Sequence, residues 1–78
     1  MASFDVRIIN DYQQPLKGVT VGLEFTSLLR GITVEECTDS DGIASFSGYD
    51  NGEVRIYIDG TNYGDYQYEE GGQITITK

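Results

Sequence analysis

The side chains that most often carry catalysis are sparse in this sequence. Cys37 is its one thiol, and no histidine is present to act as a general base or as a zinc ligand. The adjacent carboxylates Glu35-Glu36 and Glu69-Glu70 are of the type that works in pairs on glycosides, but neighbouring strand residues point to opposite faces of a sheet. Neither pair converges on one substrate, so we expect no catalytic residue, no cofactor and no enzymatic activity.

Three aspartates near predicted turns are the metal-binding candidates. Asp39, Asp41 and Asp50 offer carboxylate oxygens, the hard ligands that calcium prefers. Their spacing is not that of an EF-hand loop, and the Asp41-Gly42 pair is already explained by the chemistry of a tight turn. We therefore favour a structural turn and keep a calcium site as the alternative.

Tyrosine is unusually frequent, with six in 78 residues, and five of the six fall in the second half of the chain. It offers a large contact area at low entropic cost together with a hydroxyl that stays hydrated, which favours protein interfaces or stacking on sugars. Tyr49, Tyr57 and Tyr63 are the candidates for such a partner-binding surface. Tyr66 and Tyr68 are also explained if they complete the core.

A short apolar loop is a second candidate docking point. Leu28 and Leu29 lie in a five-residue segment that ends at Gly31 and is too short to nucleate a helix. Two leucines at a loop tip either dock on a partner or fold back over the core. Both are included among the partner-binding candidates.

The chain is short and strongly acidic. Residues 1–78 form one domain, because so small a chain cannot divide its buried surface between two cores. Thirteen acidic against five basic residues give a net charge of −8, which repels nucleic-acid phosphates and anionic membrane surfaces. Apolar runs are far shorter than the about 20 residues that cross a bilayer, and no leader-like segment opens the chain. We expect no direct nucleic-acid binding, no membrane insertion and no signal peptide in this chain.

Apolar side chains recur at every second position along most of the chain, which is the period of a half-buried strand. No segment keeps helical spacing over three turns. Asp41-Gly42 predicts a hairpin between the strands on its two sides, and a longer turn is expected over 59–64. The pattern predicts an all-β, seven-stranded Greek-key β-sandwich of the prealbumin-like or immunoglobulin-like kind. Its predicted strands are 4–9, 19–26, 32–38, 43–46, 54–59, 66–68 and 74–77.

Motifs in a fixed order run through nearly the whole chain. They are Val6-x-Ile8-x-Asn10-Asp11, then Gln14-Pro15-Leu16-Lys17-Gly18-Val19-x-Val21, then Thr38-Asp39-x-Asp41-Gly42-x-Ala44-x-Phe46, and later Val54-x-Ile56-x-Ile58-Asp59-Gly60 with Tyr63. Their order and spacing resemble the carboxypeptidase regulatory-like and Cna-B families of transthyretin-like, or prealbumin-like, sandwiches. The resemblance implies a spacer, accessory or interaction domain that lacks an active site of its own.

One property of the Cna-B family is not expected here. Its domains often contain an isopeptide bond between a first-strand lysine and a last-strand asparagine. In this chain Arg7 lies in the first strand, Lys17 falls in a loop, and 74–78 contains no asparagine. The residues for that crosslink are therefore missing.

These features predict a non-catalytic structural or protein-binding module in a larger assembly. We expect a protein partner or self-association, and favour a cell surface or virion surface as the setting. Two alternatives stay open. The charge of −8 also fits a small acidic inhibitor in a basic groove of its target, whose binding would weaken with added salt. The tyrosines also fit a carbohydrate-binding module, which a glycan array would test.

Overall fold

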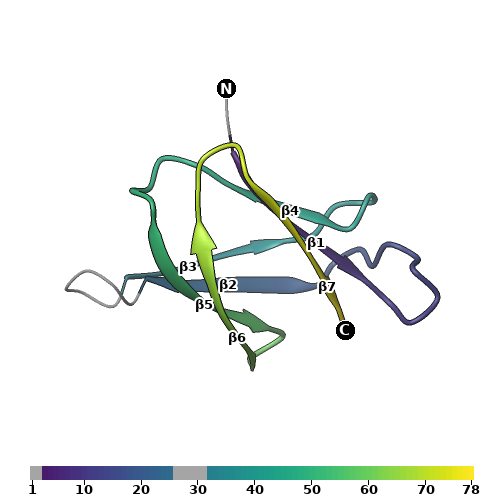
Figure 1. The fold of residues 1–78 in the computed structure, drawn as a ribbon. Helices are drawn as coiled ribbons and strands as arrows, with labels where there is room; N and C mark the ends of the chain where they lie inside the picture. Colours follow the sequence, from purple (N-terminus) through teal and green to yellow (C-terminus); the bar gives the residue numbers. More distant parts are fainter. Residues whose placement is uncertain (1–2, 26–31) are drawn as a thin grey trace.

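The computed structural model describes residues 3–25 and 32–78, which form two packed β-sheets (Figure 1). One sheet has the strand order β4-β1-β7 and the other β3-β2-β5-β6. No helix occurs in these two ranges, so none there can cross a bilayer, and the predicted all-β sandwich is confirmed. The strands are β1 (Phe4–Ile9), β2 (Thr20–Phe25), β3 (Ile32–Cys37), β4 (Ile43–Phe46), β5 (Gly52–Ile58), β6 (Thr61–Tyr68) and β7 (Gln73–Thr77).

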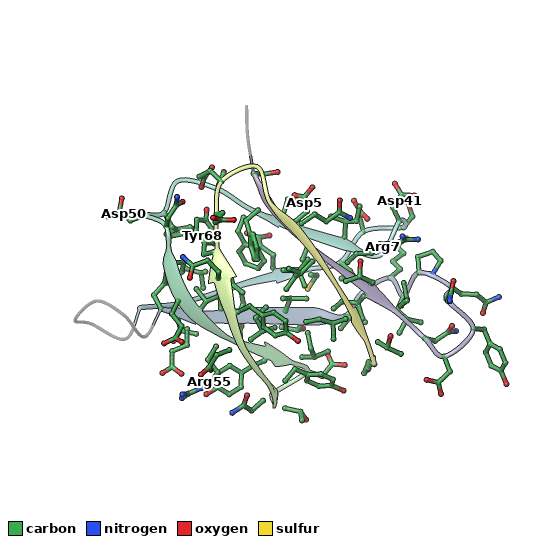
Figure 2. All side chains as sticks on the ribbon, in the orientation of Figure 1. Asp5, Arg7, Asp41, Asp50, Arg55 and Tyr68 are labelled. Atoms are coloured by element: carbon green, nitrogen blue, oxygen red, sulfur yellow. The ribbon has the colours of Figure 1, made fainter. Side chains whose placement is uncertain are left out.

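The alternation of side chains places the core between the two sheets. In β1, Phe4, Val6 and Ile8 are at most 1% exposed, whereas the residues between them are half-buried. Burial of one such aliphatic side chain contributes about 1.5–3 kcal/mol, and this is the main stabilising force in a small domain. Charged side chains such as Arg55 and Asp41 point away from this layer (Figure 2).

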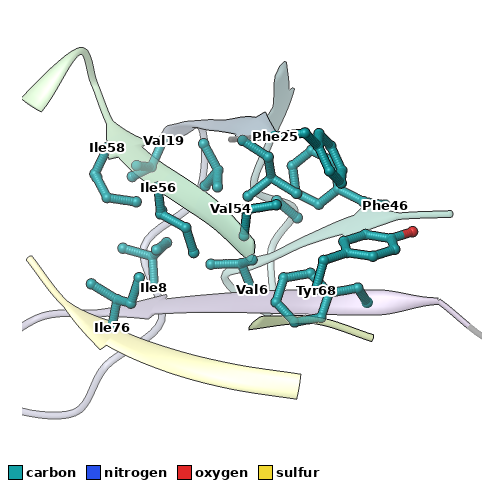
Figure 3. Packing of buried hydrophobic residues seen from close by; sticks show 14 residues of the cluster. Val6, Ile8, Val19, Phe25, Phe46, Val54, Ile56, Ile58, Tyr68 and Ile76 are labelled. Carbon is teal, nitrogen blue, oxygen red and sulfur yellow. The ribbon is translucent and has the colours of Figure 1, made fainter. Parts of the chain in front are cut away.

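Fourteen buried hydrophobic side chains form the core among the described residues (Figure 3). At one end the rings of Phe4 and Phe25 lie 5.1 Å and 5.3 Å from the ring of Tyr68. Aliphatic side chains from both sheets fill the rest, so the two sheets share one continuous core. The buried set is Phe4, Val6, Ile8, Val19, Val21, Leu23, Phe25, Ala44, Phe46, Val54, Ile56, Ile58, Tyr68 and Ile76.

The chain crosses between the sheets along a Greek-key path. β2 and β3 pair antiparallel, β4 joins β1 in the other sheet, and β5 returns to pair with β2. The hairpin predicted at Asp41-Gly42 is therefore wrong, because β3 and β4 belong to different sheets. The reversal itself is tight, with Gly42 N donating to Asp39 O at 2.9 Å. An Asp-Gly pair specifies a sharp turn but not the sheet that the next strand joins, and pairing with β1 is what buries Phe46.

A hairpin does join β5 to β6, and its turn is shorter than predicted. Asp59 and Gly60 have φ angles of 52° and 87°, and a type I′ turn requires positive φ at both positions. β6 begins at Thr61, so the turn predicted over 59–64 is wrong. The polar residues after Thr61 form an edge strand, and the register shifts between Asn62 and Asp65 as in a β-bulge.

The second and third motifs meet at one end of the sandwich. The Thr38 hydroxyl is buried, accepts a hydrogen bond from Val19 N at 2.9 Å and donates one to Leu16 O at 2.6 Å. The Thr38 backbone completes the contact, because its N–H donates to Val19 O at 2.9 Å and its carbonyl accepts from Gly18 N at 3.0 Å. The Pro-Leu-x-Gly-Val and Thr-Asp-x-Asp-Gly motifs are thus two halves of one hydrogen-bonded corner.

Loss of the Thr38 hydroxyl is expected to weaken this corner. In Thr38→Val the buried Val19 N–H has no acceptor, so the free energy of unfolding should fall by about 1–3 kcal/mol. Thr38→Ser keeps the hydroxyl and is the matched control, which should retain most of the stability. Urea unfolding of both variants measures the difference. Equal losses would contradict the role of the hydroxyl.

Candidate interaction surface

Two of the three predicted interface tyrosines pack against the core. The Tyr49 ring lies 5.2 Å from the ring of Phe25 and 6.0 Å from that of Tyr68. Tyr63 and Tyr66 are also half-buried against the core, and Tyr68 is fully buried within it. These rings do not form one exposed stacking platform, so the geometry gives no support to the carbohydrate-binding alternative.

Tyr57 is the interface candidate that faces away from the core, on the solvent side of the four-stranded sheet. Its hydroxyl donates to Glu24 Oε1 at 3.1 Å, and the same oxygen lies 3.8 Å from Arg55 Nη1. Arg55 Nε in turn donates to Asp65 Oδ1 at 3.1 Å. The network joins β2, β5 and β6 across the sheet. We call this side the outer face, with residues Thr20, Gly22, Glu24, Thr33, Glu35, Glu53, Arg55, Tyr57 and Asp65.

Negative charge predominates on the outer face. Glu24, Glu35, Glu53 and Asp65 accompany Arg55, the basic residue that the structure places among them. The hydrogen bond to Asp65 is the largest cause that raises the pKa of Arg55 above its usual value, so the guanidinium stays charged. Exposed ion pairs of this kind contribute little to stability and are open to exchange with a partner's charges. The face is suited to a cationic surface.

A groove crosses the outer face where Gly22 has no side chain. A Cβ placed at Gly22 would lie 3.6 Å from Glu35 Cγ on one side and 3.6 Å from Tyr57 Cβ on the other. The glycine therefore leaves a floor between a carboxylate wall and an aromatic wall. The groove is lined by Gly22, Glu24, Thr33, Glu35, Tyr57 and Gly60.

The calcium candidates do not come together. Asp39 Oδ1 accepts hydrogen bonds from Asp41 N at 2.9 Å and Ile43 N at 3.0 Å, so this carboxylate caps its own turn. Asp50 lies at the opposite end of the sandwich from Asp41 (Figure 2). Within the part of the chain that the structure describes, no three His, Cys, Asp or Glu side chains gather as a metal site.

The remaining candidates have separate environments. Leu28 and Leu29 lie outside the described residues. Cys37 is exposed at the end of β3, with its sulfur 4.0 Å from Thr20 Oγ1. Tyr12, which is not among the predicted interface residues, is 82% exposed in the loop after β1. Its polar neighbours in the sequence, Asp11 and Gln13, are typical of an exposed loop.

Comparison with known proteins identifies the fold alone. No protein-family model and no curated protein matches the sequence. The structure is similar to that of BcpA, the major pilin subunit of Bacillus cereus, with a TM-score of 0.66 and 17% sequence identity. The similarity covers 99% of this chain and 29% of the pilin chain, so this chain spans less than a third of the pilin's length. The chain has a pilin-like β-sandwich fold.

Proposed function

We propose that this chain is a non-catalytic β-sandwich module that contributes a protein-binding surface to a larger assembly on a cell or virion surface. The observation that carries the proposal is the open groove beside Tyr57 on a sheet whose other side is a continuous core. The Asp39 carboxylate, a group that could take part in catalysis or metal binding, instead holds its own turn by accepting hydrogen bonds from Asp41 N and Ile43 N. The likeness to a pilin supports the same class of role.

The motifs that resemble the carboxypeptidase regulatory-like and Cna-B sandwiches contact one another through Thr38 and Leu16. Such contact is expected of motifs that form the framework of a fold and not a site for a small molecule. We assign the chain to this prealbumin-like kind of module, without its isopeptide crosslink.

The partner of the outer face is a protein with a basic surface patch. Tyr57 supplies a ring wall for an arginine or lysine side chain, and Glu35 supplies an opposing carboxylate. Since exposed charges are screened by salt, the affinity of this contact should fall as ionic strength rises.

Site-specific photocrosslinking in the native source tests the proposed function. A photoreactive phenylalanine analogue in place of Thr33 lies in the groove, and the same analogue in place of Tyr12 is the control in a loop outside it. We expect one defined protein adduct from position 33, weakened by salt, and none of that mass from position 12. Recovery of only the free 8.6 kDa chain from both would contradict the proposal, as would hydrolytic turnover by the purified protein.

A further inference from the structure

Three of the four sheet edges carry features that discourage pairing with another strand. On β3, Glu35 and Glu36 are both exposed, and β4 is only four residues long. On β6, the register shift and the neighbouring Asp65 interrupt a regular ladder. Charges, short strands and bulges are the common means by which proteins protect such edges.

The fourth edge, β7, has none of these features. It pairs with β1 on one side, and no described strand pairs with it on the other (Figure 1). Gln73 to Thr77 form an unbulged, uncharged strand in which two isoleucines alternate with polar residues. The next residue along the chain, Lys78, is directed elsewhere, because its Nζ binds Asp59 Oδ2 at 2.5 Å.

The register shows which backbone groups point to this free edge. Asp5 N donates to Gly72 O at 3.0 Å, and Lys78 N donates to Ile9 O at 2.8 Å, so Gly72 and Lys78 face β1. In a parallel ladder every second residue faces the same neighbour, so the even-numbered positions face β1 throughout. The outward-facing N–H and C=O groups therefore belong to Gln73, Thr75 and Thr77.

We propose that β7 pairs antiparallel with β7 of a second copy, about a two-fold axis at Thr75. In this register Thr75 exchanges both hydrogen bonds with its own counterpart, and Gln73 exchanges both with Thr77 of the second copy. All three outward-facing residues are then satisfied. The two three-stranded sheets become one six-stranded sheet with the order β4-β1-β7-β7-β1-β4.

The pattern of β7 favours a second copy over an unrelated strand, because it is self-complementary. About Thr75, Ile74 lies opposite Ile76 of the second copy, on the core side, while the polar residues lie opposite one another on the other side. Ile74 is only half-buried in one chain, and the facing isoleucine would cover it. No like charges are opposed within the pair.

The net charge makes the salt response of this pairing distinctive. Two chains of charge −8 repel one another at long range, whereas the β7 contact is made by neutral groups. Added salt screens the repulsion, so dimerisation should strengthen with ionic strength. Binding of a basic partner to the outer face should respond in the opposite direction.

Sedimentation equilibrium of the purified 78-residue chain tests the pairing. We expect a reversible monomer–dimer equilibrium that shifts toward dimer with concentration and with salt. Thr75→Pro removes an outward N–H without breaking the ladder to β1, and should weaken dimerisation about tenfold or more, because each dimer loses two hydrogen bonds. Thr75→Val keeps the backbone donor and should dimerise as the natural chain does. Circular dichroism verifies that each variant is folded.

Charged substitutions at Thr75 test the register without introducing a proline. Thr75→Lys and Thr75→Glu each place like charges opposite one another in a homodimer, and each alone should dimerise more weakly than the natural chain. An equimolar mixture should form a heterodimer. A natural chain that stays monomeric at every concentration, a dimer indifferent to Thr75→Pro, or a mixture no tighter than its components would each overturn the proposal.

The β7 pairing rests on the proposed function in one respect only, namely that the chain belongs to a larger assembly. The sedimentation experiment uses the isolated chain, whereas photocrosslinking from Thr33 probes the outer face in the native source. A monomeric chain that still gives a groove adduct would remove the β7 pairing and leave the proposed function. A dimeric chain that gives no groove adduct would remove the proposed function and leave the β7 pairing.

Discussion

Gly42→Ala is expected to destabilise the fold by about 2–5 kcal/mol, through backbone strain and overpacking together. Gly42 has a φ of 76°, in the left-handed region, and it is buried where the two motifs meet. A Cβ there would lie 2.7 Å from Ile8 O and 2.9 Å from Pro15 Cβ. Because Ile8 O is a backbone atom, the β1 strand itself would have to move.

Gly18→Ala is the matched control for this substitution. Gly18 has a φ of 78°, nearly the same as that of Gly42, but nothing lies within 4 Å of a Cβ placed there. The control therefore carries only the left-handed strain, about 1–2 kcal/mol. Chemical unfolding of both variants isolates the cost of the clash. Equal losses would contradict close packing at Gly42.

Tyr68→Ala is expected to cost about 3–5 kcal/mol, which is a large part of the stability of a domain this small. Tyr68 is 0% exposed, and its ring contacts those of Phe4 and Phe25, which belong to different sheets. Truncation would leave a cavity at the aromatic end of the core. Tyr12→Ala, at a position 82% exposed, removes the same side chain from the surface and should change stability little. Similar losses in the two variants would refute the packing role of Tyr68.

The hydroxyl of Tyr68 makes the free energy of unfolding depend on pH in the alkaline range. Burial, and then the hydrogen bond that it donates to Glu70, raise the pKa of Tyr68 to about 12 from its ordinary value of 10.0. The folded state therefore favours the neutral phenol, and this contribution is fully present below pH 10. Between about pH 10 and 12 it should fall by about 1.4 kcal/mol for each pH unit. Tyr68→Phe has no such group, so its unfolding curves should lack this slope, and a shared slope would refute the assignment.

Period-two alternation was enough to predict the sandwich, because burial on one face of each strand is a local property of sequence. The partner of each strand is not local. Asp41-Gly42 predicted the reversal but not that β4 joins β1, since that choice depends on where Phe46 is buried. Thr61 to Gly64 looked like a turn because polar residues at a bulged edge carry the same signal as a loop.

The candidate surface was predicted in part. Tyr57 faces outward as its apolar neighbours in β5 implied, and it remains a predicted partner-binding residue. Tyr49 lies in a predicted loop, and nothing in the local sequence indicates that its ring packs against Phe25 of β2. The groove itself depends on Gly22, Glu35 and Tyr57 from three strands, a juxtaposition that only the sheet order creates.

Amide hydrogen exchange along β7 tests most directly that this chain pairs with a second copy through the free edge of β7. The backbone amides of Ile74 and Ile76 point toward β1 and provide an internal reference, whereas those of Gln73, Thr75 and Thr77 point toward the free edge. We expect exchange at the three edge amides to slow as protein concentration and salt rise, while exchange at the two isoleucine amides changes much less. Edge amides that exchange rapidly and at the same rate at every concentration would contradict this pairing.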